Sequence, residues 1–402
     1  MSDGSPQRIT ARWVFPIDSP PIERGLIEVT DGVISDVSVQ RGLPDVGTLD
    51  LGNAAIIPGL INAHAHLEFA DLKEPIQPVA PFTDWIQSLL SYRRERTSPL
   101  SELIAVGQQE SINAGVHLVG DIVTGEWTPE FVRSTGPSVV AFRELIGLLP
   151  HQADAQIEIA RHHITECRKV GGHLIPAISP HAPYSVSPDL FHRSIELAHQ
   201  ERVPLCIHLA ETQAELQLLR DGTGELYEML TAFGVWQDGV IPRESRPLDY
   251  LKPLAELDHA LIAHGNYLTS DEINFISDHP NIAVVFCPRT HAYFGHSEHP
   301  WQRLLAAGAT VCIGTDGRSS NPDYSLWAEL QFLDRQTAGM RRPDLLRMAT
   351  SCGADALAHG DRHGAIVPGR QQTMSVVDLP ANDGEPWGLL FAASSLSSRS
   401  TL

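Results

Sequence analysis

The chain has 402 residues, 42% of them hydrophobic, and a formal net charge of −20, which predicts a soluble globular protein. This acidic balance argues against nucleic acid or an anionic membrane as a partner, because both require a basic face on the protein. No stretch approaches the ~20 apolar residues of a membrane span, and the first residues contain no apolar signal core. We therefore expect a cytoplasmic protein that acts on a small molecule, and a homo-oligomer stays open.

The five cysteines are odd in number and form no C-x-x-C pair. A disulfide framework and a thiolate zinc site are therefore both disfavoured.

The N-terminal segment, residues 1–57, has β character. Alternating strands flank Asp31-Gly32, a pair that is typical of a tight hairpin turn. We interpret this segment as the N-terminal part of a small β-sandwich.

The middle of the chain, residues 58–362, alternates short apolar runs with longer helix-like stretches, which indicates parallel βα units. The eight runs lie at 55–63, 115–123, 138–147, 174–180, 203–209, 260–265, 281–287 and 310–316. Eight such units predict an α/β fold, a closed (β/α)8 TIM barrel whose active site lies at the carboxyl ends of the strands.

The last segment, residues 363–402, returns to β character over 364–370 and 374–379. We expect it to complete the β-sandwich begun by the N-terminus and to end in a mobile, serine-rich tail over 394–400.

His64-Ala65-His66 ends the first of the eight runs. Residues two apart on a strand point to the same side, so the two imidazoles can converge on one point beyond the strand. Converging neutral imidazoles suit a divalent metal ion, although an isolated His-x-His is more often a pair of surface or core histidines.

Three further runs end in similar residues, in the segments Pro204-Leu-Cys-Ile-His208-Leu-Ala-Glu211, Leu261-Ile-Ala-His264-Gly and Val311-Cys-Ile-Gly-Thr-Asp316-Gly. With these motifs in this order, the chain resembles the amidohydrolase superfamily, in its chlorohydrolase and nucleoside deaminase (ATZ/TRZ-like) branch. The resemblance implies that one divalent metal ion, zinc or alternatively iron, is bound by four residues: His64, His66, His208 and Asp316.

The resemblance also implies a hydrolytic deamination. A divalent ion held by three imidazoles and a carboxylate can lower the pKa of a bound water to ~7. Glu211 would act as the proton shuttle, His264 would orient the attacking water, and Asp316 would accept its proton. Taken singly, Glu211 is equally explained as a helix N-terminal acid and His264 as a core histidine.

Binuclear members of the superfamily bridge two metal ions with a carboxylated lysine at the end of the fourth strand. The only lysines of this chain are Lys73, Lys169 and Lys252, and none lies in the run 174–180. A mononuclear site is therefore favoured over dihydroorotase-like or urease-like chemistry.

By the same resemblance, the substrate contacts would include His181 for a purine-like ring, Trp85 packing over it, and Ser320. Each has an alternative as a loop histidine, a core anchor or a helix cap respectively. The glutamate that binds ribose in adenosine and S-adenosylhomocysteine deaminases has no clear counterpart, since the segment after Trp85 reads Tyr92-Arg-Arg-Glu95-Arg.

That segment, with His66-Leu-Glu68-Phe69, looks most like the aminodeoxyfutalosine deaminases of menaquinone synthesis, whose substrate is an adenine nucleoside with a carboxylated aromatic group. Arg143 and Arg289 would then bind the carboxylate, unless each pairs with a neighbouring acid. Methylthioadenosine or S-adenosylhomocysteine deamination, or another chlorohydrolase-like aminohydrolase activity, is the alternative activity, and a non-catalytic structural homologue is the alternative of another class.

Overall fold

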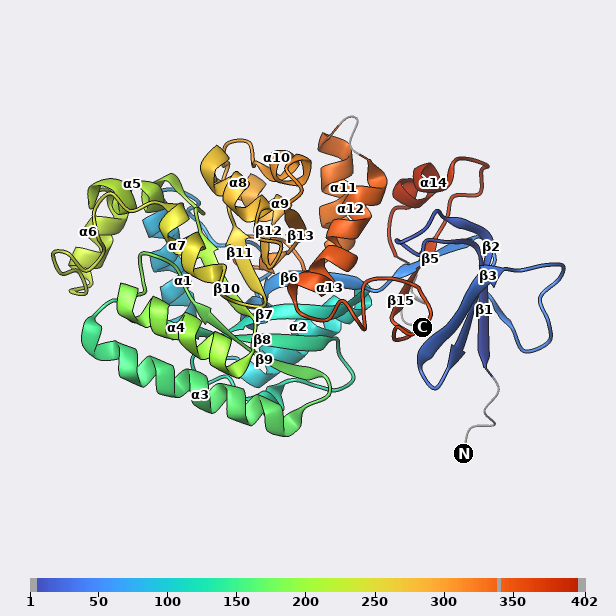
Figure 1. Cartoon of the computed structure of the whole chain (residues 1–402), viewed down its shortest axis with the longest axis horizontal. Helices are drawn as coiled ribbons and strands as arrows, with labels where there is room; N and C mark the ends of the chain where they lie inside the picture. Colours follow the sequence, from blue (N-terminus) through green and yellow to red (C-terminus); the bar gives the residue numbers. More distant parts are fainter. Residues whose placement is uncertain (1–5, 338–340, 397–402) are drawn as a thin grey trace.

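The computed structural model describes residues 6–337 and 341–396. A (β/α)8 barrel is formed by the middle of the chain, and a smaller β domain at one end of the molecule contains strands from both termini (Figure 1). The predicted fold class is thereby confirmed. Among the described residues, no helix is both long and apolar enough to pass through a bilayer.

The β domain is a six-stranded sheet in the order β15-β5-β1-β2-β3, with β4 also paired to β1. Its strands are β1 (Gln7–Val14), β2 (Ile22–Thr30), β3 (Val33–Val39), β4 (Leu49–Asp50), β5 (Ala54–Pro58) and β15 (Met374–Asp378). The antiparallel pair β2–β3 turns at Asp31 and Gly32, whose φ angles of 52° and 76° suit the predicted hairpin turn.

The two termini meet on β5, which runs parallel to β1 and antiparallel to β15. Since β5 ends at Pro58 and the first barrel strand begins at Leu60, the β domain leads directly into the barrel. Leu396 forms an isolated bridge with Val377, and the rest of the predicted serine-rich tail lies outside the described residues.

The barrel sheet runs in the order β13-β12-β11-β10-β9-β8-β7-β6-β14, and all its pairings are parallel. Its strands are β6 (Leu60–His66), β7 (Val116–Val123), β8 (Ser138–Leu145), β9 (Leu174–Pro180), β10 (Leu205–Leu209), β11 (Ala260–His264), β12 (Ile282–Phe286), β13 (Thr310–Ile313) and β14 (Asp316–Gly317).

The eighth strand of the barrel is divided into β13 and β14, and it closes the barrel by pairing with β12 on one side and β6 on the other. At the division, the Gly314 amide donates to the Phe286 carbonyl at 2.9 Å and the Thr315 amide donates to the His64 carbonyl at 3.1 Å. Closure brings the carboxyl ends of all eight strands to one face, where a TIM barrel carries its active site.

Helices follow the strands and surround the barrel (Figure 1). The α-helices are α1 (Phe82–Glu95), α2 (Leu100–Asn113), α3 (Ala153–Val170), α4 (Pro188–Glu201), α5 (Gln213–Asp221), α6 (Glu225–Ala232), α7 (Pro247–Leu254), α8 (Ser270–Ser277), α9 (Pro288–Tyr293), α10 (Trp301–Ala306), α11 (Leu326–Gln336), α12 (Arg342–Met348), α13 (Ser351–Ala356) and α14 (Pro386–Ala392). Three short 3₁₀ helices are η1 (Leu67–Phe69), η2 (Pro129–Phe131) and η3 (Pro150–Gln152).

The barrel strands are buried on both faces, which explains why they read as continuous apolar runs. On β10, Cys206 belongs to one buried cluster, while Leu205 and Ile207 belong to another. His208 continues the phase of Cys206, because side chains alternate along a strand. Strand alternation thus points a histidine inward at the carboxyl end of the barrel.

Candidate active site

Four imidazoles and one carboxylate gather at the carboxyl ends of the barrel strands. The centroid of the His64 ring lies 5.0 Å from that of His66, 4.9 Å from that of His208 and 5.5 Å from that of His264. Asp316 Oδ1 lies 3.4 Å from His66 Nε2 and 3.7 Å from His64 Nε2. All five residues are buried, and they come from β6, β10, β11 and β14.

Two of these residues have a left-handed backbone, with φ angles of 68° at His264 and 58° at Asp316. Non-glycine residues adopt this conformation at a cost, which is typically found where a side chain must be redirected at a functional site. Alternation from Leu261 and Ala263, which belong to the inner cluster, would otherwise place His264 on the helix-facing side of β11. The turn at His264 accounts for its ring lying 5.5 Å from that of His208.

Hydrogen bonds from neighbouring residues hold these groups in place. His208 Nδ1 contacts the His181 carbonyl at 3.0 Å, so this nitrogen carries the proton and Nε2 is left with a free lone pair. The Ser320 hydroxyl donates to Asp316 Oδ2 at 2.6 Å, and the Tyr324 hydroxyl donates to the His66 carbonyl at 2.7 Å. Such supporting contacts fix the orientation of ligand side chains.

Burial determines the protonation states of the cluster. It lowers the pKa of His66 to about 4, although Asp316 opposes the effect, and it lowers the pKa of His264 to about 3 and that of His208 well below its usual value. Burial alone would raise the pKa of Asp316, but the surrounding imidazoles, His64 first, bring it below its usual value. His66, His208 and His264 therefore offer neutral imidazoles at neutral pH and Asp316 offers an ionised carboxylate, which are the forms that bind metal ions.

The donor set fits a divalent metal ion. Ligand atoms of His64, His66 and His208 lie within 4.8 Å of one another, and so do those of His64, His264 and Asp316. Among the described residues, Nδ1 of His64 and Nδ1 of His66 have no hydrogen-bonding partner although both atoms are buried. Buried polar atoms without partners are costly, and coordination or ordered water would remove that cost. Three imidazoles and one carboxylate suit zinc.

Glu211 lies beside this cluster, with Oε1 3.6 Å from His264 Nε2. Burial and the negative charges of Asp316 and Glu215 raise the pKa of Glu211 well above its usual value. The backbone of Glu211 is held on both sides, since its amide donates to Glu215 Oε2 at 3.0 Å and its carbonyl accepts from Asn266 Nδ2 at 2.9 Å. A buried carboxyl group with a raised pKa and a fixed backbone is suited to proton transfer.

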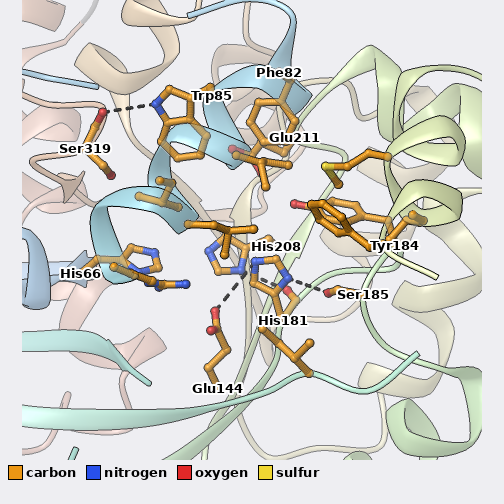
Figure 2. A pocket seen from close by; sticks show the side chains of 18 of the residues that line it. His66, Phe82, Trp85, Glu144, His181, Tyr184, Ser185, His208, Glu211 and Ser319 are labelled. Atoms are coloured by element: carbon orange, nitrogen blue, oxygen red, sulfur yellow. Dashed lines mark hydrogen bonds and ion pairs between the residues drawn. The ribbon is translucent and has the colours of Figure 1, made fainter. Parts of the chain in front are cut away.

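A cavity of about 300 Å³ opens directly onto the cluster (Figure 2). Its floor contains His66, His208, His264, Asp316 and Glu211. Most of the wall is apolar, and it is contributed by α1, α6 and the loops after β8, β9 and α6: Phe82, Trp85, Ile86, Leu89, Leu90, Ile146, Leu148, Tyr184, Met229, Leu230, Phe233 and Val235. A concave apolar site with a few convergent polar groups is the usual form of a small-molecule site.

Of the predicted substrate contacts, His181 and Trp85 line this cavity. Trp85 Nε1 donates to the Ser319 carbonyl at 3.4 Å, which ties the first barrel loop to the turn after the eighth strand (Figure 2). Ser319, rather than Ser320, lines the cavity, because the Ser320 side chain is fully engaged with Asp316 and Thr290. The structure thus places Ser320 as a support for Asp316 and not at the cavity surface.

The structure does not bring Arg143 to the cavity. On β8, Val140 and Phe142 face the barrel interior, so alternation turns Arg143 outward and Glu144 inward. Arg143 instead donates to the Gly125 carbonyl at 2.8 Å and lines a separate surface hollow. The prediction that Arg143 contacts the substrate is corrected by this alternation.

Arg289 is also absent from the cavity lining. It pairs with acidic residues instead, which is the alternative that the sequence left open. Its guanidinium donates to Glu329 Oε1 and Asp323 Oδ1, both at 2.7 Å, and the Glu329 side chain is completely buried. Arg318 is engaged elsewhere as well, by Glu110 at 3.1 Å. These arginines stabilise the loops after strands seven and eight.

Replacing Arg289 with methionine is therefore expected to lower stability rather than to change substrate preference. The substitution leaves the Glu329 carboxylate buried without its cation, which costs about 3–5 kcal/mol of unfolding free energy. Chemical denaturation monitored by circular dichroism checks this, with Arg335→Met, an exposed arginine on α11, as the control. A loss below about 1 kcal/mol, or an altered ratio of activities between substrates, would contradict the structural role.

Two charged residues at the cavity were not among the predicted site residues. Arg93, on α1, lines the cavity, donates to Glu68 Oε1 at 2.6 Å and lies over the Phe69 ring, so it is not part of a solvated helix face. Glu144, on β8, lines the cavity on the side away from Trp85 and Phe82 (Figure 2). Glu144 follows the inward residues Val140 and Phe142 at intervals of two, and this spacing is the sequence signal that could have identified it as an inward residue.

A model of the amidohydrolase family matches residues 55–398, which include the whole barrel and β15. The 5-methylthioadenosine/S-adenosylhomocysteine deaminase of Nitratidesulfovibrio vulgaris is 29% identical over 91% of this chain and 82% of its own. The aminodeoxyfutalosine deaminase of a Nitratiruptor species is 27% identical over 82% of this chain and 80% of its own. Two deaminase activities on related molecules are thus represented among similar proteins.

The structure is similar to that of the aminofutalosine deaminase of Helicobacter pylori, solved in complex with methylthio-coformycin. The TM-score is 0.84 at 22% identity, and the superposition covers 98% of this chain and all of the other. At this identity the likeness shows the shared fold of barrel and β domain.

Proposed function

Because this chain belongs to the amidohydrolase family, we propose that it is a metal-dependent hydrolase that removes the amino group of an adenine-type nucleoside. The observation that carries the proposal is the placement of Glu211 next to the imidazole–carboxylate cluster, at the floor of a single apolar cavity. Hydrolytic deamination needs an activated water and a group that moves protons between that water, the ring and the leaving ammonia. The floor of this cavity supplies both.

One divalent ion, for which we propose zinc, would be held by His64, His66, His208 and Asp316. Bound there, it would supply an activated water for attack on the ring carbon that carries the amino group. The described residues contain no lysine near this cluster, since Lys73, Lys169 and Lys252 are all exposed, which supports a single ion.

The proton transfers are assigned to side chains of the cavity floor. Glu211, whose pKa is raised by burial, donates a proton to the ring nitrogen next to the attacked carbon. Its carboxylate then takes the proton of the newly added hydroxyl group and passes it to the departing amino group, so that ammonia leaves instead of an amide ion, and the proton that Asp316 took from the water restores the acid form of Glu211. Asp316 accepts the proton of the water, and the neutral His264 imidazole, 3.6 Å from Glu211, orients the attack.

For the substrate itself we propose a nucleoside with a large substituent in place of its 5′-hydroxyl, and aminodeoxyfutalosine as the first candidate. Arg93 favours the carboxylated substituent of that molecule, since it is the one lysine or arginine among the described lining residues. A single side-chain hydrogen bond engages it, to Glu68, and its buried Nε has no partner in the described chain. Its remaining N–H groups are available for a carboxylate.

Methylthioadenosine is the second candidate, favoured by a different observation. The wall formed by Met229, Leu230, Phe233 and Val235 is apolar and suits a thioether. The carboxyl groups of Glu144 and Asp316 also line the cavity and outnumber the single arginine, which opposes an anionic substituent.

Ammonia release from aminodeoxyfutalosine, methylthioadenosine, S-adenosylhomocysteine and adenosine tests the proposal. With aminodeoxyfutalosine as the substrate, kcat/KM should exceed that for adenosine by about tenfold to a hundredfold, since hydrogen bonds to charged groups contribute ~1.5–3 kcal/mol. Arg93→Met should remove most of this preference, while Arg94→Met, on the exposed side of α1, should keep it. A preference for methylthioadenosine that Arg93→Met leaves unchanged would favour the second candidate.

A further inference from the structure

Glu144 presents a nearly buried carboxyl group to the cavity from the end of β8. Its side chain is only 5% exposed, and it lies on the inward side of the strand with Val140 and Phe142. Figure 2 shows it pointing toward the His181 imidazole, at the side of the cavity away from Trp85. The proposed proton transfers do not use this residue.

The carboxyl oxygens of Glu144 have no hydrogen-bond donor among the described residues. The group that comes nearest is His181 Nε2, whose distance of 3.8 Å from Glu144 Oε1 is too long for a hydrogen bond. A carboxylate removed from bulk water without donors is costly in free energy. The position is therefore prepared for donors that a ligand brings.

The tautomer of His181 strengthens the need for hydrogen-bond donors from a ligand. Its Nδ1 contacts Ser185 Oγ at 2.6 Å, and Ser185 Oγ donates to the Ala182 carbonyl at 3.1 Å, an oxygen that can only accept. The serine hydroxyl has a single proton, so His181 Nδ1 donates to it and His181 Nε2 is an acceptor.

Two acceptors, Glu144 Oε1 and His181 Nε2, thus face the same part of the cavity 3.8 Å apart. One hydroxyl placed between them can donate to only one of the two, so a ligand must bring two adjacent donors to satisfy both. A vicinal diol has this arrangement. It is also the arrangement of the 2′- and 3′-hydroxyls of ribose.

We propose that Glu144, together with His181, binds the ribose diol of the substrate and makes the enzyme selective for ribonucleosides. This inference rests on the proposed function and deepens it. It also accounts for the lack of a clear ribose-binding glutamate in the segment after Trp85, because the carboxylate comes from β8 instead.

The test compares adenosine with 2′-deoxyadenosine in the metal-loaded enzyme. A hydroxyl that donates to a charged group changes kcat/KM by about tenfold or more, so the wild type should prefer adenosine by at least that factor. Glu144→Gln should reduce the ratio severalfold and Glu144→Ala should bring it close to unity, mainly by slowing adenosine. Glu126→Gln, an exposed glutamate on the loop after β7, is the control and should keep the wild-type ratio.

A wild-type ratio near unity, or a ratio that Glu144→Ala leaves unchanged, would overturn the diol assignment while the deaminase proposal stands. Equilibrium binding of both nucleosides to Glu211→Gln and to Glu211→Gln/Glu144→Ala separates the two ideas when turnover is absent. Selective adenosine binding that requires Glu144, without turnover by the wild type, would keep the diol subsite and reject deamination. Failure of both nucleosides to bind would reject the subsite as well.

Discussion

Replacing Glu211 with glutamine is expected to lower kcat by about 10²–10⁴-fold while the metal content stays at the wild-type level. The amide cannot donate an acidic proton or carry one between water and ammonia, but the proposed ligands are untouched. Glutamine is also close to glutamate in shape, and the contacts of the Glu211 backbone with Glu215 and Asn266 do not involve the replaced atoms. Steady-state kinetics and metal analysis on the same preparation check both expectations.

The Glu211 result separates chemistry from binding. Near-normal turnover with metal bound would assign the proton transfers to another residue, for which Asp316 would be the first candidate. Loss of metal together with activity would instead show that Glu211 acts mainly through the structure of the cluster.

Replacing His66 with alanine is expected to remove most of the bound metal and to abolish activity. The wild type should hold about one equivalent of metal per chain, and His66 is one of the residues whose ligand atoms lie within 4.8 Å of one another. Because the ion binds the folded state, its loss should also lower the temperature of thermal unfolding. Elemental analysis and a thermal melt measure these effects.

His192→Ala is the matched control for that variant, since His192 is exposed on α4 and distant in sequence from every proposed ligand. It should retain metal and activity. Two tightly held equivalents in the wild type would reject the mononuclear site, and full metal retention by His66→Ala would remove His66 from the ligand set.

The barrel and the convergence of its polar strand ends could be predicted from the sequence because both depend on local patterns. Apolar runs such as 203–209 recur at barrel spacing, and β10 occupies Leu205–Leu209 in the structure. The Asp31-Gly32 hairpin is equally local, since two residues with positive φ determine the turn. Barrel closure brings together the run ends that carry His64, His66, His208, His264 and Asp316, and the positive φ angles of His264 and Asp316 redirect those two residues toward the cluster.

The substrate contacts depended on information that is not local. Arg289 pairs with Glu329, forty residues later in the chain, and nothing in either segment alone shows that partner. Arg93 is drawn from the helix surface to the cavity by Glu68 on the 3₁₀ helix after β6. The contributions of α6 to the apolar wall likewise follow from how the loop after β10 folds over the barrel.

The outward position of Arg143 could have been predicted from the sequence. The segment Val139–Glu144 alternates between the two faces of β8, and the inward position of Phe142 implies an inward Glu144 and an outward Arg143. The carboxylate that the phase implies belongs to Glu144, the residue for which we propose a role in sugar binding.

Ammonia release as a function of bound metal is the measurement that tests the central claim most directly. Apoprotein loaded with increasing zinc should convert an adenine nucleoside to the corresponding hypoxanthine nucleoside and release an equal amount of ammonia. The rate should rise in proportion to bound zinc up to about one equivalent per chain. Protein that holds about one equivalent of zinc and releases no ammonia from aminodeoxyfutalosine, methylthioadenosine, S-adenosylhomocysteine or adenosine would contradict the account.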